Sequence, residues 1–180
     1  MTITLTTDVG GVSSNSYISE SDATTYVNER VLDRSLRDFW ARALSDDRAR
    51  ALIKATQLLD TMVRWAGYKT TAEQALEWPR SGMYDTSLYA ISDTVIPDAI
   101  TSAQTEIAVW LLSKSGVNPT NTEGQFSAIK IGPITVDYAD SKLGASQEYL
   151  PPIVQSLING FGIIMPPSSG GIRMVPIVRR

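Results

Sequence analysis

The sequence predicts a mainly α-helical fold: a small helical bundle with one β-hairpin and with extended N- and C-terminal arms. Apolar residues recur at helical spacing in five stretches, and they alternate with polar residues over one internal segment. Glycine, proline, serine and threonine gather toward both ends of the chain. Because 43% of the 180 residues are hydrophobic and 19% are charged, the chain suits one globular domain with arms.

Residues 1–18 form the predicted N-terminal arm. Ile3 and Leu5 alternate with threonines, which is typical of a short strand, and Gly10-Gly11 then interrupts the pattern. We expect an extended arm that becomes ordered only if a partner pairs with it. A terminus without fixed structure is the alternative.

The helical domain, residues 19–165, should begin with three helices. Ser19 is a good N-cap for the first, and the second spans about residues 35–44. The third, residues 46–65, has the clearest apolar stripe, and Gly67 follows its end. The second helix should place Leu36, Phe39, Trp40 and Ala43 on one face, and the stripe of the third consists of Ala49, Leu52, Ile53, Leu59 and Val63.

Residues 68–96 show no periodic pattern and are long for a loop in a compact domain. A proline after Trp78 favours extended backbone at that tryptophan. We therefore expect Trp78 to anchor the loop and Pro79 to set its direction, while Arg80 pairs with an acid. A role of the loop in an interface is the alternative.

A fourth helix should begin at Pro97, because proline suits the first helical turn. Its apolar stripe consists of Ile100, Ile107 and Leu111. Glu106 lies among these apolar residues, which predicts a carboxylate paired at the rim of the core or a salt bridge to Arg64 or Arg80. Glu77 is the other candidate partner of Arg80.

Residues 127–138 predict a β-hairpin, because apolar and polar residues alternate on both sides of Gly132-Pro133. Two strands alone are marginally stable, so another chain or the N-terminal arm should complete the sheet. The last helix should open at Pro151-Pro152. Its apolar side consists of Ile153, Val154 and Leu157.

Residues 166–180 are predicted to be a C-terminal docking arm. They begin with Pro-Pro-Ser-Ser-Gly-Gly, which has the composition of a linker. Apolar residues beyond a linker are hard to bury in their own domain, so we expect docking in a groove or on a sheet edge of another chain. The candidate docking residues are Ile172, Arg173, Val175, Ile177, Val178, Arg179 and Arg180. A tail without fixed structure is the alternative.

The composition argues against an enzyme. The chain contains no cysteine and no histidine, which excludes a thiolate nucleophile, a Ser-His-Asp triad and the usual zinc ligands. Glycine-rich phosphate-binding motifs are absent from the sequence, and the acidic pairs Asp46-Asp47 and Asp137/Asp140 are weak as cation sites. We expect no cofactor, no metal, no membrane-spanning segment and no secretory signal.

The charge distribution is unfavourable for gripping DNA. The net charge is −3, and residues 66–165 hold ten acids and five bases, whereas the last fifteen residues hold three arginines and no acid. A protein that binds duplex DNA usually presents a basic surface. Single-strand binding needs aromatic side chains in a basic groove, and only Trp65 and Tyr68 have a basic neighbour in sequence.

The order of six motifs resembles the small head-tail connector, or adaptor, proteins of tailed bacteriophages. The motifs are Asn15–Ser19, Leu52–Asp60, Arg64–Gly67, Gln74–Gly82, Ile96–Ile100 and Lys130–Ile134. The likeness covers about residues 15–160, and Trp-Pro-Arg-x-Gly followed by Ile-Pro is its most specific part. Relatives of these connectors often carry the label of a DnaT-like single-stranded DNA-binding protein.

The resemblance implies a virion protein, made in the host cytoplasm, that assembles as a ring of copies of itself, usually twelve. Such a ring lies beneath the portal protein and joins it to the next tail or nozzle protein. Genomic DNA passes through the channel without sequence-specific binding. In these adaptors a C-terminal extension often docks on the portal, and residues 166–180 match that role by position and composition. A DnaT-like single-stranded DNA-binding protein is the alternative function.

Overall fold

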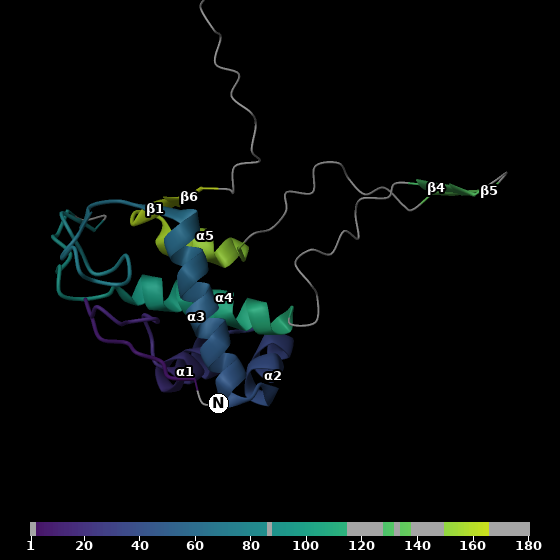
Figure 1. Ribbon diagram of the computed structural model, residues 1–180, viewed down its shortest axis with the longest axis horizontal. Coiled ribbons are helices and arrows are strands. Elements are labelled where there is room, and N and C mark those ends of the chain that lie inside the picture. Colours follow the sequence, from purple (N-terminus) through teal and green to yellow (C-terminus); the bar gives the residue numbers. More distant parts are fainter. Residues whose placement is uncertain (1–2, 86–87, 115–127, 132–133, 138–149, 166–180) are drawn as a thin grey trace, which may run out of the picture.

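The computed structural model describes residues 3–85, 88–114, 128–131, 134–137 and 150–165. In these residues the chain forms the helices α1 (Glu20–Arg30), α2 (Arg34–Arg42), α3 (Ser45–Met62), α4 (Asp98–Ser113) and α5 (Pro152–Ile158). The strands are β1 (Val63–Trp65), β2 (Tyr68–Lys69), β3 (Arg80–Ser81), β4 (Ala128–Ile131), β5 (Ile134–Asp137) and β6 (Gly162–Ile164). The predicted fold class, mainly helical with small antiparallel β elements, is confirmed (Figure 1).

Helix α4 lies at the centre of the domain and packs against α1, α2, α3 and α5. Figure 1 shows it crossing α3, which runs from the α1–α2 end of the domain to the β1–β6 sheet. Ile100, Ala103, Ile107 and Ala108 on α4 are completely buried. Because other helices cover α4 on several sides, it needs apolar residues around nearly its whole circumference. Among the described residues, no helix is long and apolar enough to span a bilayer.

The core faces of three helices differ from the predicted stripes. The buried face of α3 runs through Leu52, Ala55, Thr56 and Leu59. Ile53, one residue off that line, is only half-buried. Phe39 on α2 is 47% exposed and Ile153 on α5 is 48% exposed, so placing these two residues in the core was wrong. Apolar spacing gives the direction of a buried face, whereas the neighbouring helices decide which residues at its margin are covered.

The segment before α1 is extended, as predicted, but its own domain holds it in place. Ser16 and Tyr17 are buried. The Gln104 side chain on α4 accepts a hydrogen bond from the Tyr17 backbone N–H at 3.0 Å and donates one to Ser16 Oγ at 2.7 Å. The Asn15 side chain accepts a hydrogen bond from the backbone N–H of Thr6 at 2.9 Å. Residues 3–18 therefore do not depend on a partner chain for their position, contrary to the expectation from sequence.

Three two-stranded antiparallel sheets are present in the described residues. β4 pairs with β5 from Ala128 opposite Asp137 to Ile131 opposite Ile134, which confirms the predicted hairpin. That sheet contains two strands, and residues 3–18 form no strand, so the N-terminal arm does not extend it. The pairing of β1 with β6 was not predicted. The third helix ends at Met62 rather than at residue 65, because Val63–Trp65 pair with Gly162–Ile164.

Candidate functional surfaces

Trp78 lies inside the domain, where it holds the long loop. Its side chain is 1% exposed. The Trp78 ring meets the Trp65 ring edge-on, with centroids 5.7 Å apart and planes at 90°, and it meets Phe161 at the same distance and 70°. Pro79 is also buried, and its ring lies beside Gly10 of the N-terminal segment. Edge-to-face contacts of this kind add to the hydrophobic gain from burying a tryptophan.

The Arg80 guanidinium forms hydrogen bonds to backbone and side-chain groups at both ends of the preceding segment, residues 66–77. Its Nε donates to the Ala66 carbonyl oxygen at 2.6 Å, and its Nη2 donates to the Gly67 carbonyl oxygen at 2.9 Å. Its Nη1 donates to the Glu77 carboxylate at 2.7 Å, so Glu77 is the acid that pairs with Arg80. Glu106 instead accepts a hydrogen bond from the Tyr26 hydroxyl at 3.0 Å. The buried guanidinium is therefore occupied by its own chain rather than available to a ligand.

The partly buried carboxylate of Asp60 joins α3 to two segments that are distant in sequence. The Tyr17 hydroxyl donates to Asp60 Oδ1, and the Glu77 backbone N–H donates to Asp60 Oδ2 at 3.3 Å. Burial raises the pKa of Asp60 to about 6. Burial and the adjacent Asp60 carboxylate raise the pKa of Tyr17 well above its ordinary value. This network was not predicted, because Asp60 lies in an ordinary helical stretch and its partners are 43 and 17 residues away.

Of the two acidic pairs considered as weak cation sites, Asp46-Asp47 bonds to other groups of the chain, and the side chains of Asp137 and Asp140 lie outside the described part. Asp46 Oδ1 accepts a hydrogen bond from the Ile3 backbone N–H at 3.2 Å. Asp47 forms an ion pair with Arg50 at 2.7 Å. Asp140 and the side chain of Asp137 are outside the described residues. Within the described part of the chain, no group of three or more acidic side chains could hold a metal ion.

A basic groove lies between α2, α3 and α4. Its volume is about 650 Å³. Its lining residues are Phe39, Arg42, Ala43, Asp47, Arg50, Ala51, Lys54, Leu111 and Leu112. Arg50 is paired with Asp47, whereas Arg42 and Lys54 form no ion pair with any described residue. The groove therefore combines an exposed phenyl ring with two uncompensated positive charges. Sequence reasoning missed it because three helices contribute and Phe39 was assigned to the core.

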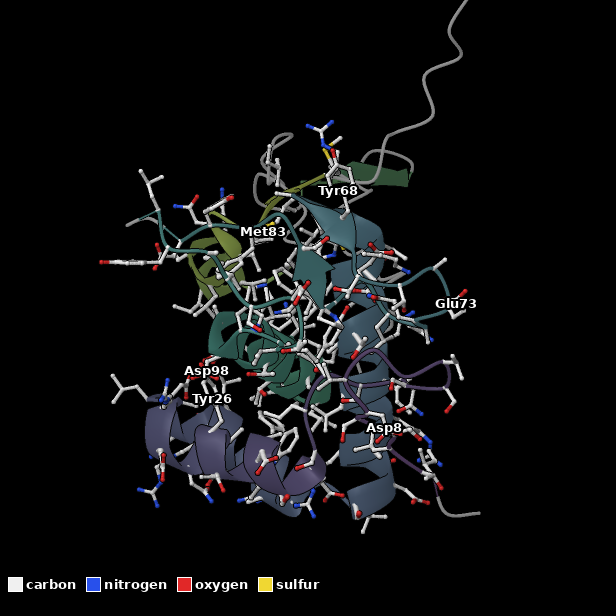
Figure 2. The ribbon with its side chains drawn as sticks, turned by 90° about the vertical axis from the view of Figure 1, so that its left-hand side faces the viewer. Asp8, Tyr26, Tyr68, Glu73, Met83 and Asp98 are labelled. Carbon is white, nitrogen blue, oxygen red and sulfur yellow. The ribbon has the colours of Figure 1, made fainter. Side chains whose placement is uncertain are left out.

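Most of the large exposed apolar side chains in the described residues fall into three groups by their position in the chain, apart from Val9, Val12 and Tyr68. The first group, in the loop before α4, consists of Tyr84, Leu88, Tyr89 and Val95; the second, around α2, of Leu32, Phe39 and Leu44; the third, at α5 and β6, of Ile153, Ile163 and Met165. In Figure 1, α2 and the β1–β6 sheet lie at opposite ends of α3. Figure 2 shows Tyr68 and Met83 near the sheet end and Tyr26 at the end formed by α1.

The predicted docking arm lies outside the described residues. Its candidate residues, Ile172, Arg173, Val175, Ile177, Val178, Arg179 and Arg180, all belong to the segment that follows Met165. The three loop residues Trp78, Pro79 and Arg80 lie together in the interior. The structure thus separates the sequence-predicted residues into an internal anchor and a terminal segment.

The family comparison matches the whole chain. A family model described as "Putative DnaT-like ssDNA binding protein" matches residues 1–180, and the chain belongs to this family. No curated protein and no solved structure matches it significantly. The family description agrees with the alternative function, single-stranded DNA binding, and does not mention a phage connector.

Proposed function

We propose that this chain is a structural head-tail connector of a tailed bacteriophage, a ring-forming subunit that surrounds the DNA channel. The observation that carries the proposal is the number of large apolar side chains that one small domain leaves exposed, before α4, around α2, and at α5 and β6. Contiguous apolar surface on a soluble protein usually marks an interaction site. A ring subunit needs two lateral contacts with copies of itself, and further contacts with the proteins above and below.

The charge of the chain suits a channel through which DNA slides. The net charge is −3, so the chain as a whole does not attract the duplex, although the groove between α2, α3 and α4 is locally basic. In this proposal the partners are other copies of the chain, the portal protein and the next tail or nozzle protein. The arm from residue 166 to residue 180 contacts the portal, the complex lies at the capsid-tail junction of the virion, and the chain catalyses no reaction.

The proposal is tested with the full-length chain alone and mixed with portal rings from the same phage. Light scattering should give the mass of a closed ring, or of a complex in which several copies sit on one portal. Negative-stain images should show a central channel. A chain that stays monomeric at all concentrations, and that leaves the portal rings unchanged, would exclude the connector function.

Single-stranded DNA binding is the second candidate, and both the family description and the basic groove favour it. Arg42 and Lys54 could contact phosphates while a base stacks on Phe39. Stacking of a base on an aromatic side chain is worth about 1–3 kcal/mol, and phosphate contacts make binding sensitive to salt.

The second candidate is tested by the anisotropy of a labelled oligothymidine at several salt concentrations. If the groove binds DNA, Arg42→Ala with Lys54→Ala should weaken binding at least about tenfold and reduce its salt dependence. Phe39→Ala should weaken binding without changing the salt dependence. Arg34 is exposed on the same helix but does not line the groove, so Arg34→Ala is the matched control. Equal losses in the groove and control variants would exclude a site in this groove.

A further inference from the structure

In the described residues neither outer edge of the two-stranded β1–β6 sheet pairs with a further strand, and one of these edges belongs to β6. Arg64 lies opposite Ile163 in the register, and the Met165 backbone N–H donates to the Met62 carbonyl oxygen at 2.7 Å. Backbone groups alternate in direction along an antiparallel strand. The N–H and C=O groups of Ile163 and Met165 therefore point to β1, whereas those of Gly162 and Ile164 point away from it. No described strand pairs with this outer edge.

A groove runs along the same edge. It has a volume of about 450 Å³ and is formed by α5 on one side and β6 on the other. Its lining residues are Gln155, Ser156, Ile158, Asn159, Gly162, Ile163 and Ile164. Ile163 is 59% exposed, and Met165 and Ile153 are each nearly half exposed. An unpaired strand edge beside exposed apolar side chains has the features of a site for an added strand.

We propose that this groove binds residues Ile172–Val175 of a second copy of the chain, which add a third strand to the β1–β6 sheet. The inference rests on the proposed ring. The candidate strand is apolar except for Arg173, and its length matches the short edge of β6. Pro176 lacks a backbone N–H and so limits the added strand to the four residues before it. Ile177–Arg180, beyond that proline, remain available to the portal.

The sequence directly after β6 favours an exchange between copies over a return to the same sheet. Pro166 restricts Met165 to extended backbone, and Pro166-Pro167 favours continuation of the chain away from the strand. Ser168–Gly171 have the serine and glycine composition of a linker. Each copy carries one donor segment and one acceptor edge, and a head-to-tail contact of this kind closes into a ring when the rotation between copies permits.

The chain contains no cysteine, so two introduced cysteines report this contact without background. The test variant combines Ser156→Cys in the groove with Met174→Cys in the tail. Ser156 is exposed, and serine and cysteine are similar in size, so folding should be unaffected. After oxidation, or treatment with a short bis-maleimide, non-reducing gels should show a ladder of covalent multimers. Each single-cysteine variant is a control, and so is Asn28→Cys with Met174→Cys, because Asn28 is exposed on α1 away from the groove.

Light scattering on the same sample before cross-linking separates this inference from the proposed ring. The exchange is supported if the sample contains rings and the variant with cysteines at 156 and 174 forms covalent multimers at least about tenfold faster than the control with cysteines at 28 and 174. Rings without that preference overturn the exchange and leave the ring proposal intact. A fast-migrating, internally linked monomer shows that the tail returns to its own sheet, which also overturns the inference. Monomers without any cross-link contradict both proposals.

Discussion

The interior around Trp78 and the groove beside Phe39 use similar residue types in opposite ways. In the interior, aromatic rings and an arginine are held by the chain itself: Trp78 packs on Trp65 and Phe161, and Arg80 donates to the carbonyl oxygens of Ala66 and Gly67 and to Glu77. In the groove, Phe39 is exposed, and Arg42 and Lys54 form no ion pair with the described residues.

This comparison shows that the most specific sequence motif of a protein can lie in its interior rather than on a surface that binds a partner. Trp-Pro-Arg is the most specific motif of the sequence, yet its three side chains are buried and hold the loop of residues 68–96 in position. The groove is built from common residues on three helices and has no motif. Substitutions in the interior should therefore affect stability first, whereas substitutions in the groove should affect binding and leave stability nearly unchanged.

The largest expected effect is that of Trp78→Ala. Removing this buried ring leaves a cavity against Trp65 and Phe161, and such truncations cost about 3–5 kcal/mol in the free energy of unfolding. Urea denaturation followed by tryptophan fluorescence and circular dichroism measures the loss. Tyr89→Ala is the matched control, since Tyr89 is an exposed aromatic residue of the same loop, and its loss should stay within about 0.5 kcal/mol. Equal midpoints for both variants would show that Trp78 does not anchor the loop.

The next comparison separates two neighbouring residues on α3. Leu52 is completely buried, so Leu52→Ala should cost about 2–5 kcal/mol. Ile53→Ala should cost clearly less, because that side chain is only partly buried. Denaturant midpoints of the two variants, measured under the same conditions, decide the order. A larger loss for Ile53 would favour the apolar stripe predicted from the sequence over the buried face seen in the structure.

The helices and the hairpin could be predicted from local pattern, because apolar spacing, capping residues and prolines act over a few residues. The end of α3 could not be predicted in this way. Val63–Trp65 continue a helical apolar pattern but pair with Gly162–Ile164, about a hundred residues away. The outward position of Phe39 and Ile153 has a similar cause, since both lie at the margin of short helices whose neighbours are set by the tertiary fold.

The polar contacts of the interior were also beyond local pattern. Glu77 and Arg80 lie three residues apart, so their pairing could be predicted from spacing. Gln104 and Ser16 are 88 residues apart, and Asp60 and Tyr17 are 43 apart. Gln104 and Asp60 lie on helices and their partners precede α1, so local pattern does not show which groups bond to them. The groove was missed for the same reason, because its lining comes from α2, α3 and α4.

A smaller effect is expected for Arg80→Lys. Lysine keeps the positive charge and can still approach Glu77, but it lacks the guanidinium donors that reach the carbonyl oxygens of Ala66 and Gly67. Buried acceptors left without a donor cost about 1–3 kcal/mol. Urea denaturation should show a loss in this range, whereas Arg34→Lys on the exposed surface of α2 should show none. A fully stable Arg80→Lys variant would mean that charge alone holds the loop.

The most specific effect concerns Asp60 and pH. Burial raises the pKa of Asp60 from about 4 to about 6, so the folded chain binds a proton more readily than the unfolded chain. The stabilisation from that proton is complete below about pH 4 and is lost as the pH rises through 6, with a slope of up to about 1 kcal/mol per pH unit. An Asp60→Asn variant keeps the charged and titratable groups that surround this position, which are Tyr17, Glu77 and Lys69.

Asparagine does not titrate in this range, so the difference in unfolding free energy between the natural chain and Asp60→Asn isolates the carboxyl group. The natural chain should gain relative to the variant as the pH falls from 7 to 4. Burial also raises the pKa of Glu106, and this group contributes in the same direction in both proteins, so it cancels in the difference. Urea denaturation at half-unit pH steps gives both curves. A difference that does not change between pH 4 and 7 would place Asp60 in contact with water rather than in the interior with Tyr17.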